Sequence, residues 1–153
     1  MKHSIAFLIS SAISVCCVFS SCVRFGPDPE PAAVTYTIEK VNENRVIIYI
    51  EDVKEVRFDY QSQWTLMDVM DDAKVCAKLT YESAGGMVTS IEGKANAADF
   101  SSCWMLYTSD TEMANKQWGE ITVEDKTLGS AIVGAESLTV LEGETYVWEY
   151  QTF

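Results

Sequence analysis

Histidine is almost absent from this chain, since the only one is His3. The region beyond the N-terminal segment therefore lacks Ser-His-Asp and Cys-His nucleophilic machinery. It also lacks imidazole-containing zinc sites and the side chain best suited to proton transfer near neutral pH. Carboxylate pairs remain, such as Glu142 with Glu144 and Asp71 with Asp72, but these fall in a predicted turn and on a predicted helix surface. We therefore expect a binding or structural protein, not an enzyme, and no metal site.

Basic residues are also scarce. The chain has 11 Lys and Arg against 23 Asp and Glu, which gives a net charge of −12. The electrostatic attraction that drives non-specific binding to nucleic acid has the wrong sign here, so we expect no nucleic-acid partner. This negative charge can serve either to bind cations or to keep the protein soluble, and we favour the role in solubility.

Long apolar runs are limited to one, from Ile5 to Phe19, and it follows Lys2. A basic start, an apolar run too short to span a bilayer well and two small residues, Ser20 and Ser21, are typical of a secretory leader. Cys22 comes directly after them, and this pattern is typical of a bacterial lipoprotein. We therefore predict that residues 1–21 are a signal peptide and that acylated Cys22 holds the chain on the outer face of the membrane. An ordinary leader followed by a coincidental cysteine is the alternative.

Proline is confined to Pro27, Pro29 and Pro31. Alternating prolines favour an extended and stiff backbone. Residues 22–33 are therefore predicted to be a lipidated linker, and residues 34–153 a single domain.

Cysteine is sparse beyond the linker, where Cys76 and Cys103 remain. An even pair in an oxidising compartment is a candidate disulfide. Two buried thiols that pack as small apolar side chains are the alternative.

Alternating apolar and polar residues predict a domain rich in strands. We expect strands at 34–39, 46–50, 56–60, 77–82, 87–91, 103–108 and 146–150, and shorter pieces near 121–123 and 138–140. We expect a loop at 94–102 and a polar, irregular stretch at 109–120. One helix is predicted to begin after Thr65, which forms a capping-box pattern with Asp68. An apolar stripe follows at Leu66, Val69, Met70 and Ala73,. The fold class is therefore α+β: a mostly β single domain with one helix packed on a mixed sheet, in a β-grasp-like arrangement.

Five segments resemble the domain family DUF4430, which is similar to the C-terminal β-domain of transcobalamin and intrinsic factor. They are 65–70 (TLMDVM), 86–93 (GMVTSIEG), 104–107 (WMLY), 129–131 (GSA) and 143–150 (GETYVWEY). The resemblance extends over roughly residues 35–153. The chain departs from the family after Thr108, where Ser109-Asp110 and an insert through Trp118 replace the usual Asn-Gly turn.

The resemblance implies a small ligand-binding module, and it makes a cobalamin-like corrinoid the candidate ligand. A flat apolar ligand requires aromatic faces and backbone donors. The residues that we expect to line its site are Trp104, Tyr107, Trp118, Gly129, Ser130 and Ala131. Core packing is the other reading of Trp104 and Trp148, whereas the polar neighbours of Trp118 favour exposure. Sugars stack on the same aromatic residues, and a surface module that binds a protein or the cell-wall matrix is the alternative function.

Overall fold

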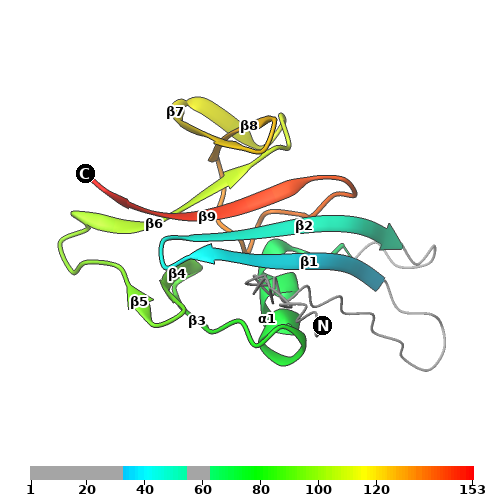
Figure 1. The fold of residues 1–153 in the computed structure, drawn as a ribbon, viewed down its shortest axis with the longest axis horizontal. Helices are drawn as coiled ribbons and strands as arrows, with labels where there is room; N and C mark the ends of the chain where they lie inside the picture. Colours follow the sequence, from blue (N-terminus) through cyan, green and yellow to red (C-terminus); the bar gives the residue numbers. More distant parts are fainter. Residues whose placement is uncertain (1–32, 55–62) are drawn as a thin grey trace, which may run out of the picture.

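The computed structural model describes residues 33–54 and 63–153. Six strands form one sheet in the order β1-β2-β9-β6-β8-β7, and three short strands form a second sheet in the order β3-β4-β5. The elements are β1 (Ala33–Asn42), β2 (Arg45–Lys54), α1 (Leu66–Cys76), β3 (Tyr81–Ala84), β4 (Met87–Ile91), β5 (Lys94–Ala95), β6 (Ser102–Thr108), β7 (Ala114–Val123), β8 (Lys126–Ala131) and β9 (Thr145–Thr152). Figure 1 shows α1 and the small sheet on one side of the large sheet, and the β7–β8 hairpin on the other.

Over residues 33–54 and 63–153, the mostly β composition with one helix is confirmed, but the mixed sheet is not. Every strand pair in the described ranges is antiparallel. A parallel pair needs a crossover that returns the chain to the same sheet. Here α1 instead leads into β3, which belongs to the second sheet, so the helix does not supply a parallel neighbour for β2.

The helix begins where the capping box predicts. The Thr65 amide donates to the Asp68 carboxylate at 2.8 Å, and the Asp68 amide donates to Thr65 Oγ1 at 3.3 Å. The predicted stripe of Leu66, Val69, Met70 and Ala73 is fully buried against the large sheet. The helix is neither long nor apolar enough to cross a membrane, and the described residues include no other candidate span.

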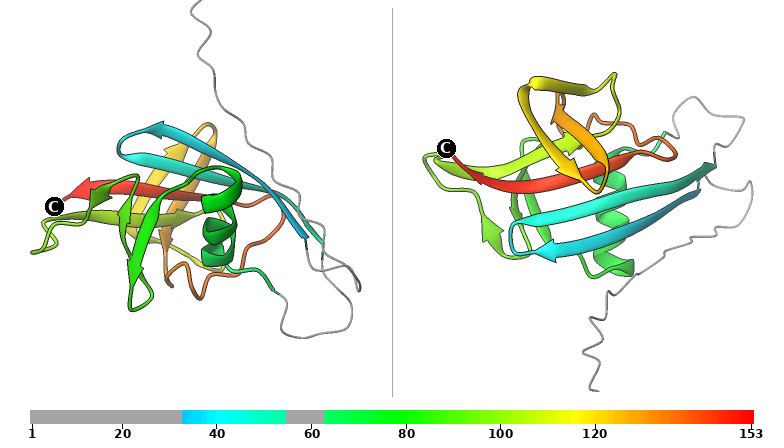
Figure 2. Two further views of the ribbon diagram at one scale, coloured as in Figure 1. Left: turned by 90° about the horizontal axis from the view of Figure 1, so that it is seen from below. Right: turned by 45° about the horizontal axis from the view of Figure 1, so that its top comes forward.

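The large sheet has two different faces. The helix face carries alternate residues such as Ile48, Tyr146 and Trp148, which belong to the main core with α1. The hairpin face carries the residues between them. There Ile47, Tyr107 and Val147 form a smaller cluster with Val123 and Leu128 of the β7–β8 hairpin. The hairpin is joined to β6 at only two register positions, and it folds back over this face (Figure 2).

Several predicted boundaries are corrected by the structure. No strand forms at 77–80, because Lys78 adopts a φ of 53° and the amide of Leu79 donates to Ala73 O at the helix end,. Residues 94–95 form β5 in the segment that we predicted to be a loop. The segment at 138–140 is no regular strand: Thr139 forms one isolated bridge with Thr65. The strand predicted at 56–60 lies outside the described residues.

Candidate functional site

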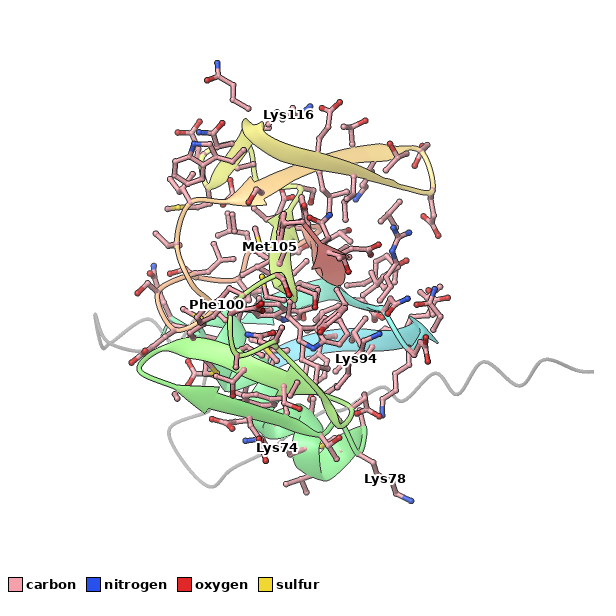
Figure 3. All side chains as sticks on the ribbon, turned by 90° about the vertical axis from the view of Figure 1, so that its left-hand side faces the viewer. Lys74, Lys78, Lys94, Phe100, Met105 and Lys116 are labelled. Atoms are coloured by element: carbon pink, nitrogen blue, oxygen red, sulfur yellow. The ribbon has the colours of Figure 1, made fainter. Side chains whose placement is uncertain are left out.

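The most distinctive surface feature of the domain is a bulge in β7. Asn115 pairs with Ser130, and Glu120 pairs with Gly129, the next residue along β8. The residues 116–119 therefore protrude from the ladder, and we call this segment the β7 bulge. The sequence predicts an irregular region at 109–120, and this is wrong for residues 114–120, which belong to β7. The bulge interrupts the alternation that a strand of ten residues would otherwise show. Lys116 marks the bulge at the top of Figure 3.

Two glycines allow the β7 bulge to form. Gly119 has a φ of 149°, and a Cβ atom at this position would lie 3.2 Å from the hydroxyl of Tyr107. A Cβ atom on Gly129 would lie 3.0 Å from Ala114 Cβ and 3.2 Å from the backbone carbon of Asn115. The amide of Gln117 donates to Asn115 Oδ1 at 2.9 Å, which closes a local turn,. Bulges of this kind recur near functional sites, because they re-aim side chains out of a ladder.

Trp118 lies on the β7 bulge, and 64% of its surface is exposed. This confirms the exposure predicted from its polar neighbours. Tyr107 lies beneath the bulge and is only 2% exposed. Burial raises the pKa of the Tyr107 phenol, while a hydrogen bond with Gln151 acts in the opposite direction. The bulge therefore rests on a neutral, buried phenol and presents an indole to solvent.

Four other predicted site residues lie close to the bulge. Tyr107 pairs with Ser130 across β6 and β8. Gly129 contacts the start of the bulge, and Ala131 pairs with Ala114 at its base. They lie in strands and not in a loop rim, and both Gly129 and Ser130 are buried. Among the predicted residues, the structure therefore gathers Tyr107, Trp118, Gly129, Ser130 and Ala131 around one hairpin.

Trp104 is separated from that group, because it lies on the helix face. Its indole N–H donates to Lys94 O at 2.7 Å, and its ring meets Tyr150 edge to face with the ring centroids 5.4 Å apart. Trp148 is also buried on the helix face, and its indole N–H has no acceptor among the described residues. Core packing, the other reading of Trp104 and Trp148, is thus confirmed.

Cys76 and Cys103, the cysteines of the described residues, are not bridged to each other. Cys76 ends α1 on the helix side of the large sheet, whereas Cys103 shares the hairpin face with Met105. The sheet stands between them, so the predicted disulfide is not formed. Sequence could not reveal this, since the face on which each thiol lies depends on strand order. Burial raises the pKa of the Cys103 thiol.

The three aspartates of α1 each have a structural role. Asp68 caps the helix, and the Asp72 carboxylate accepts from the Tyr36 hydroxyl at 2.7 Å. Asp71 accepts from Lys74 and from Tyr81, and these hydrogen bonds lower the pKa of its carboxyl group. Within the described ranges, no group of three or more His, Cys, Asp or Glu residues is placed to hold a metal ion.

Sequence reasoning missed a second exposed aromatic feature at the end of the sheet. Phe100 is 56% exposed, and its backbone adopts a φ of 57°, which is unusual for a bulky residue,. Phe153 is also exposed, and its amide donates to Ser101 O at 2.9 Å, next to Phe100. Neither residue lies in an alternating pattern, so periodicity gave no signal for this pair.

Residues 63–127 match the family model DUF4430, a domain of unknown function. The match includes α1, β3 to β7 and the start of β8, and hence the whole β7 bulge. No curated protein and no solved structure matches the chain significantly. The domain assignment from sequence is therefore supported over this range, and the family description assigns no activity to it.

Proposed function

We propose that this chain is an extracytoplasmic lipoprotein, anchored to the membrane through acylated Cys22, whose domain is a non-enzymatic binding module. The β7 bulge is its contact surface. The observation that carries this proposal is the placement of Trp118. A large aromatic side chain is held in solvent by a segment that depends on two glycines and a buried tyrosine. Exposed aromatic residues are favoured at binding surfaces, because they supply a large contact area at a low entropic cost.

A cobalamin-like corrinoid is the first ligand to test at this surface. The support for it is the motif resemblance to the C-terminal β-domain of transcobalamin and intrinsic factor. The β-grasp-like arrangement belongs to the same proposal: its support is that α1 crosses a sheet in which the last strand, β9, is an interior strand. The indole of Trp118 would stack on the flat face of the ligand, with Tyr107, Gly129, Ser130 and Ala131 supporting the hairpin. Trp104 is left out of this ligand set because it packs in the core.

Equilibrium dialysis of the purified chain against cobalamin tests this proposal, with tryptophan fluorescence as a second readout. We expect saturable binding that Trp118→Ala abolishes. Val75→Ala is the matched control, because Val75 is an exposed apolar residue on α1 and lies away from the bulge. No saturation at concentrations on the order of tens of micromolar would eliminate the corrinoid.

An interaction module for a surface protein or the wall matrix is the second candidate. Its support is β1, a ten-residue strand at one edge of the large sheet. Exposed edge strands accept strands from partners. This candidate predicts that cobalamin does not bind and that cross-links to other surface proteins form at β1 and not at the β7 bulge.

Membrane anchoring is tested separately. Cell fractionation should recover the native chain with the membrane, and Cys22→Ala should release it, because acyl chains supply the anchor. A Cys22→Ala chain retained by the membrane as well as the native chain would contradict the anchor and leave the binding proposal standing.

A further inference from the structure

Two sulfur atoms converge on the hairpin face of β6. Cys103 and Met105 are alternate residues of one strand, so their side chains lie on the same face. Cys103 Sγ lies 3.7 Å from Met105 Sδ, and both residues are partly exposed. Figure 3 shows Met105 between the β7–β8 hairpin and the segment that carries Phe100.

The residues opposite this pair carry oxygen atoms that already have partners on the protein. Across the ladder, Cys103 pairs with Gln151 and Met105 pairs with Glu149. Directly opposite residues share a face and lie close together. Glu149 is bound by Arg45, with Arg45 Nε 2.5 Å and Nη2 3.1 Å from its two carboxylate oxygens. Arg45 neutralises the charge of Glu149 and occupies its carboxylate oxygens. The sulfur atoms of Cys103 and Met105 are therefore the donors on this part of the face that suit a soft cation,.

We propose that Cys103 and Met105 bind a soft monovalent cation, Cu(I) or Ag(I). Thiolate and thioether sulfur are the ligands that such cations prefer over oxygen. With metal–sulfur distances of about 2.3 Å, as for other thiolate sites, sulfur atoms at this separation subtend an angle of about 110° at the metal. That angle leaves room for a third ligand from solution. Binding replaces the thiol proton: Cys103–SH and M⁺ give Cys103–S–M and one released H⁺.

This site and the proposed ligand surface use different residues, although Tyr107, which supports the hairpin, packs in the same cluster as Met105. Cys103 and Met105 lie on β6, whereas Trp118 lies on β7, and none of the residues that form the β7 bulge supplies a sulfur atom. Failure of cobalamin binding would therefore leave the metal site untouched. Loss of the metal site would equally leave the binding proposal in place.

Peptide-resolved alkylation of the reduced full chain tests the site, with Cys76 as an internal control. Free Cu(I) is buffered with bathocuproine disulfonate under anaerobic conditions, so that each thiol reports its own occupancy. We expect Cu(I) to slow iodoacetamide labelling of Cys103 at least about tenfold, and to leave labelling of Cys76 unchanged at the same free Cu(I). Equal protection of both thiols, or none at Cys103, would overturn the proposal.

Met105→Leu separates a two-sulfur site from a single reactive thiol. Leucine preserves the volume of the side chain, so the fold should tolerate it. We expect Met105→Leu to reduce the protection of Cys103 to the level seen at Cys76. If Cys103 stays fully protected in this variant, the thioether is not a ligand and the proposed pair is wrong. Thermal unfolding of both chains, compared under the same conditions, reports whether the variant has kept its fold.

Discussion

The helix face and the hairpin face of the large sheet are both apolar, but they are covered in different ways. On the helix face, α1, the small sheet and the 135–140 segment together bury a continuous core. On the hairpin face, one folded-back hairpin covers a smaller cluster around Leu128. The helix face thus holds most of the apolar burial that stabilises the domain. The hairpin face holds the exposed indole, the sulfur pair and the bulge.

The two faces differ in how many backbone hydrogen bonds hold the segments that pack on them. The chain around α1 is tied to the 135–140 segment by three backbone hydrogen bonds, such as Leu66 N to Leu138 O at 2.8 Å. The β7–β8 hairpin is attached to β6 only at Tyr107 and Thr108. A hairpin that is held by few backbone hydrogen bonds can shift without unfolding the domain. The hairpin face can therefore tolerate an exposed aromatic side chain and a bulge better than the helix face.

The largest effects are expected from cavities in the two cores. Leu66 and Leu128 are both fully buried leucines, one on each face. We expect Leu66→Ala to lower the free energy of unfolding by about 4–5 kcal/mol and Leu128→Ala by about 2–3 kcal/mol. The second value is smaller because the hairpin can settle into the cavity. Urea denaturation measures both, and an equal or larger loss for Leu128→Ala would remove the distinction between the faces.

A methyl group at Gly129 tests how tightly the hairpin supports the β7 bulge. The new Cβ would meet Ala114 Cβ at 3.0 Å and the backbone of Asn115 at 3.2 Å. We expect Gly129→Ala to cost about 1–3 kcal/mol and to change the emission of Trp118, because the bulge must move. Thr127→Ala, at an exposed position of the same strand, is the control. A variant as stable as the native chain would mean that the close approach at Gly129 is relieved at no cost.

The capping box offers a smaller perturbation that is confined to the helix face. Thr65→Ala removes the hydroxyl that accepts from the Asp68 amide. We expect a loss of about 1 kcal/mol, and Thr65→Ser should restore most of it because serine caps equally well. Urea denaturation of the three chains gives the comparison. The same loss in Thr65→Ser would assign the effect to the methyl group and not to the cap.

The helix face was largely predictable from sequence, because its signals are local. The capping box at Thr65 and the stripe through Ala73 fix α1 within a few residues. Strict alternation at Tyr36 and Ile38, and again at Tyr146 and Trp148, reveals which residues face the core. The antiparallel pairing of β2 with β9 was not visible, since strand order depends on contacts between distant segments.

The hairpin face was harder to predict, because its features depend on register. The β7 bulge interrupts the alternation of apolar and polar residues, so the strand that contains it could not be recognised from sequence. The exposure of Trp118 was predicted, but its support by Gly119 and Tyr107 was not. The proximity of the sulfur atoms of Cys103 and Met105 follows from alternation within β6. The even number of cysteines beyond the linker points instead to Cys76 as the partner of Cys103. Opposite faces exclude that partner, and only the sheet order shows it.

The smallest change in stability is expected at Trp118, and it is the sharpest test of what the hairpin face is for. Truncation of a mostly exposed side chain leaves the core intact, so Trp118→Ala should change the free energy of unfolding by no more than about 0.5 kcal/mol. Trp148→Ala, on the helix face, should cost about 3–5 kcal/mol by the same measurement. If Trp118→Ala destabilised the domain by several kcal/mol, the indole would be a structural residue of the bulge. Retained stability with lost binding would instead separate the role of this tryptophan from that of Trp148, and it would extend the difference in exposure that the polar neighbours of Trp118 predict to a difference in function.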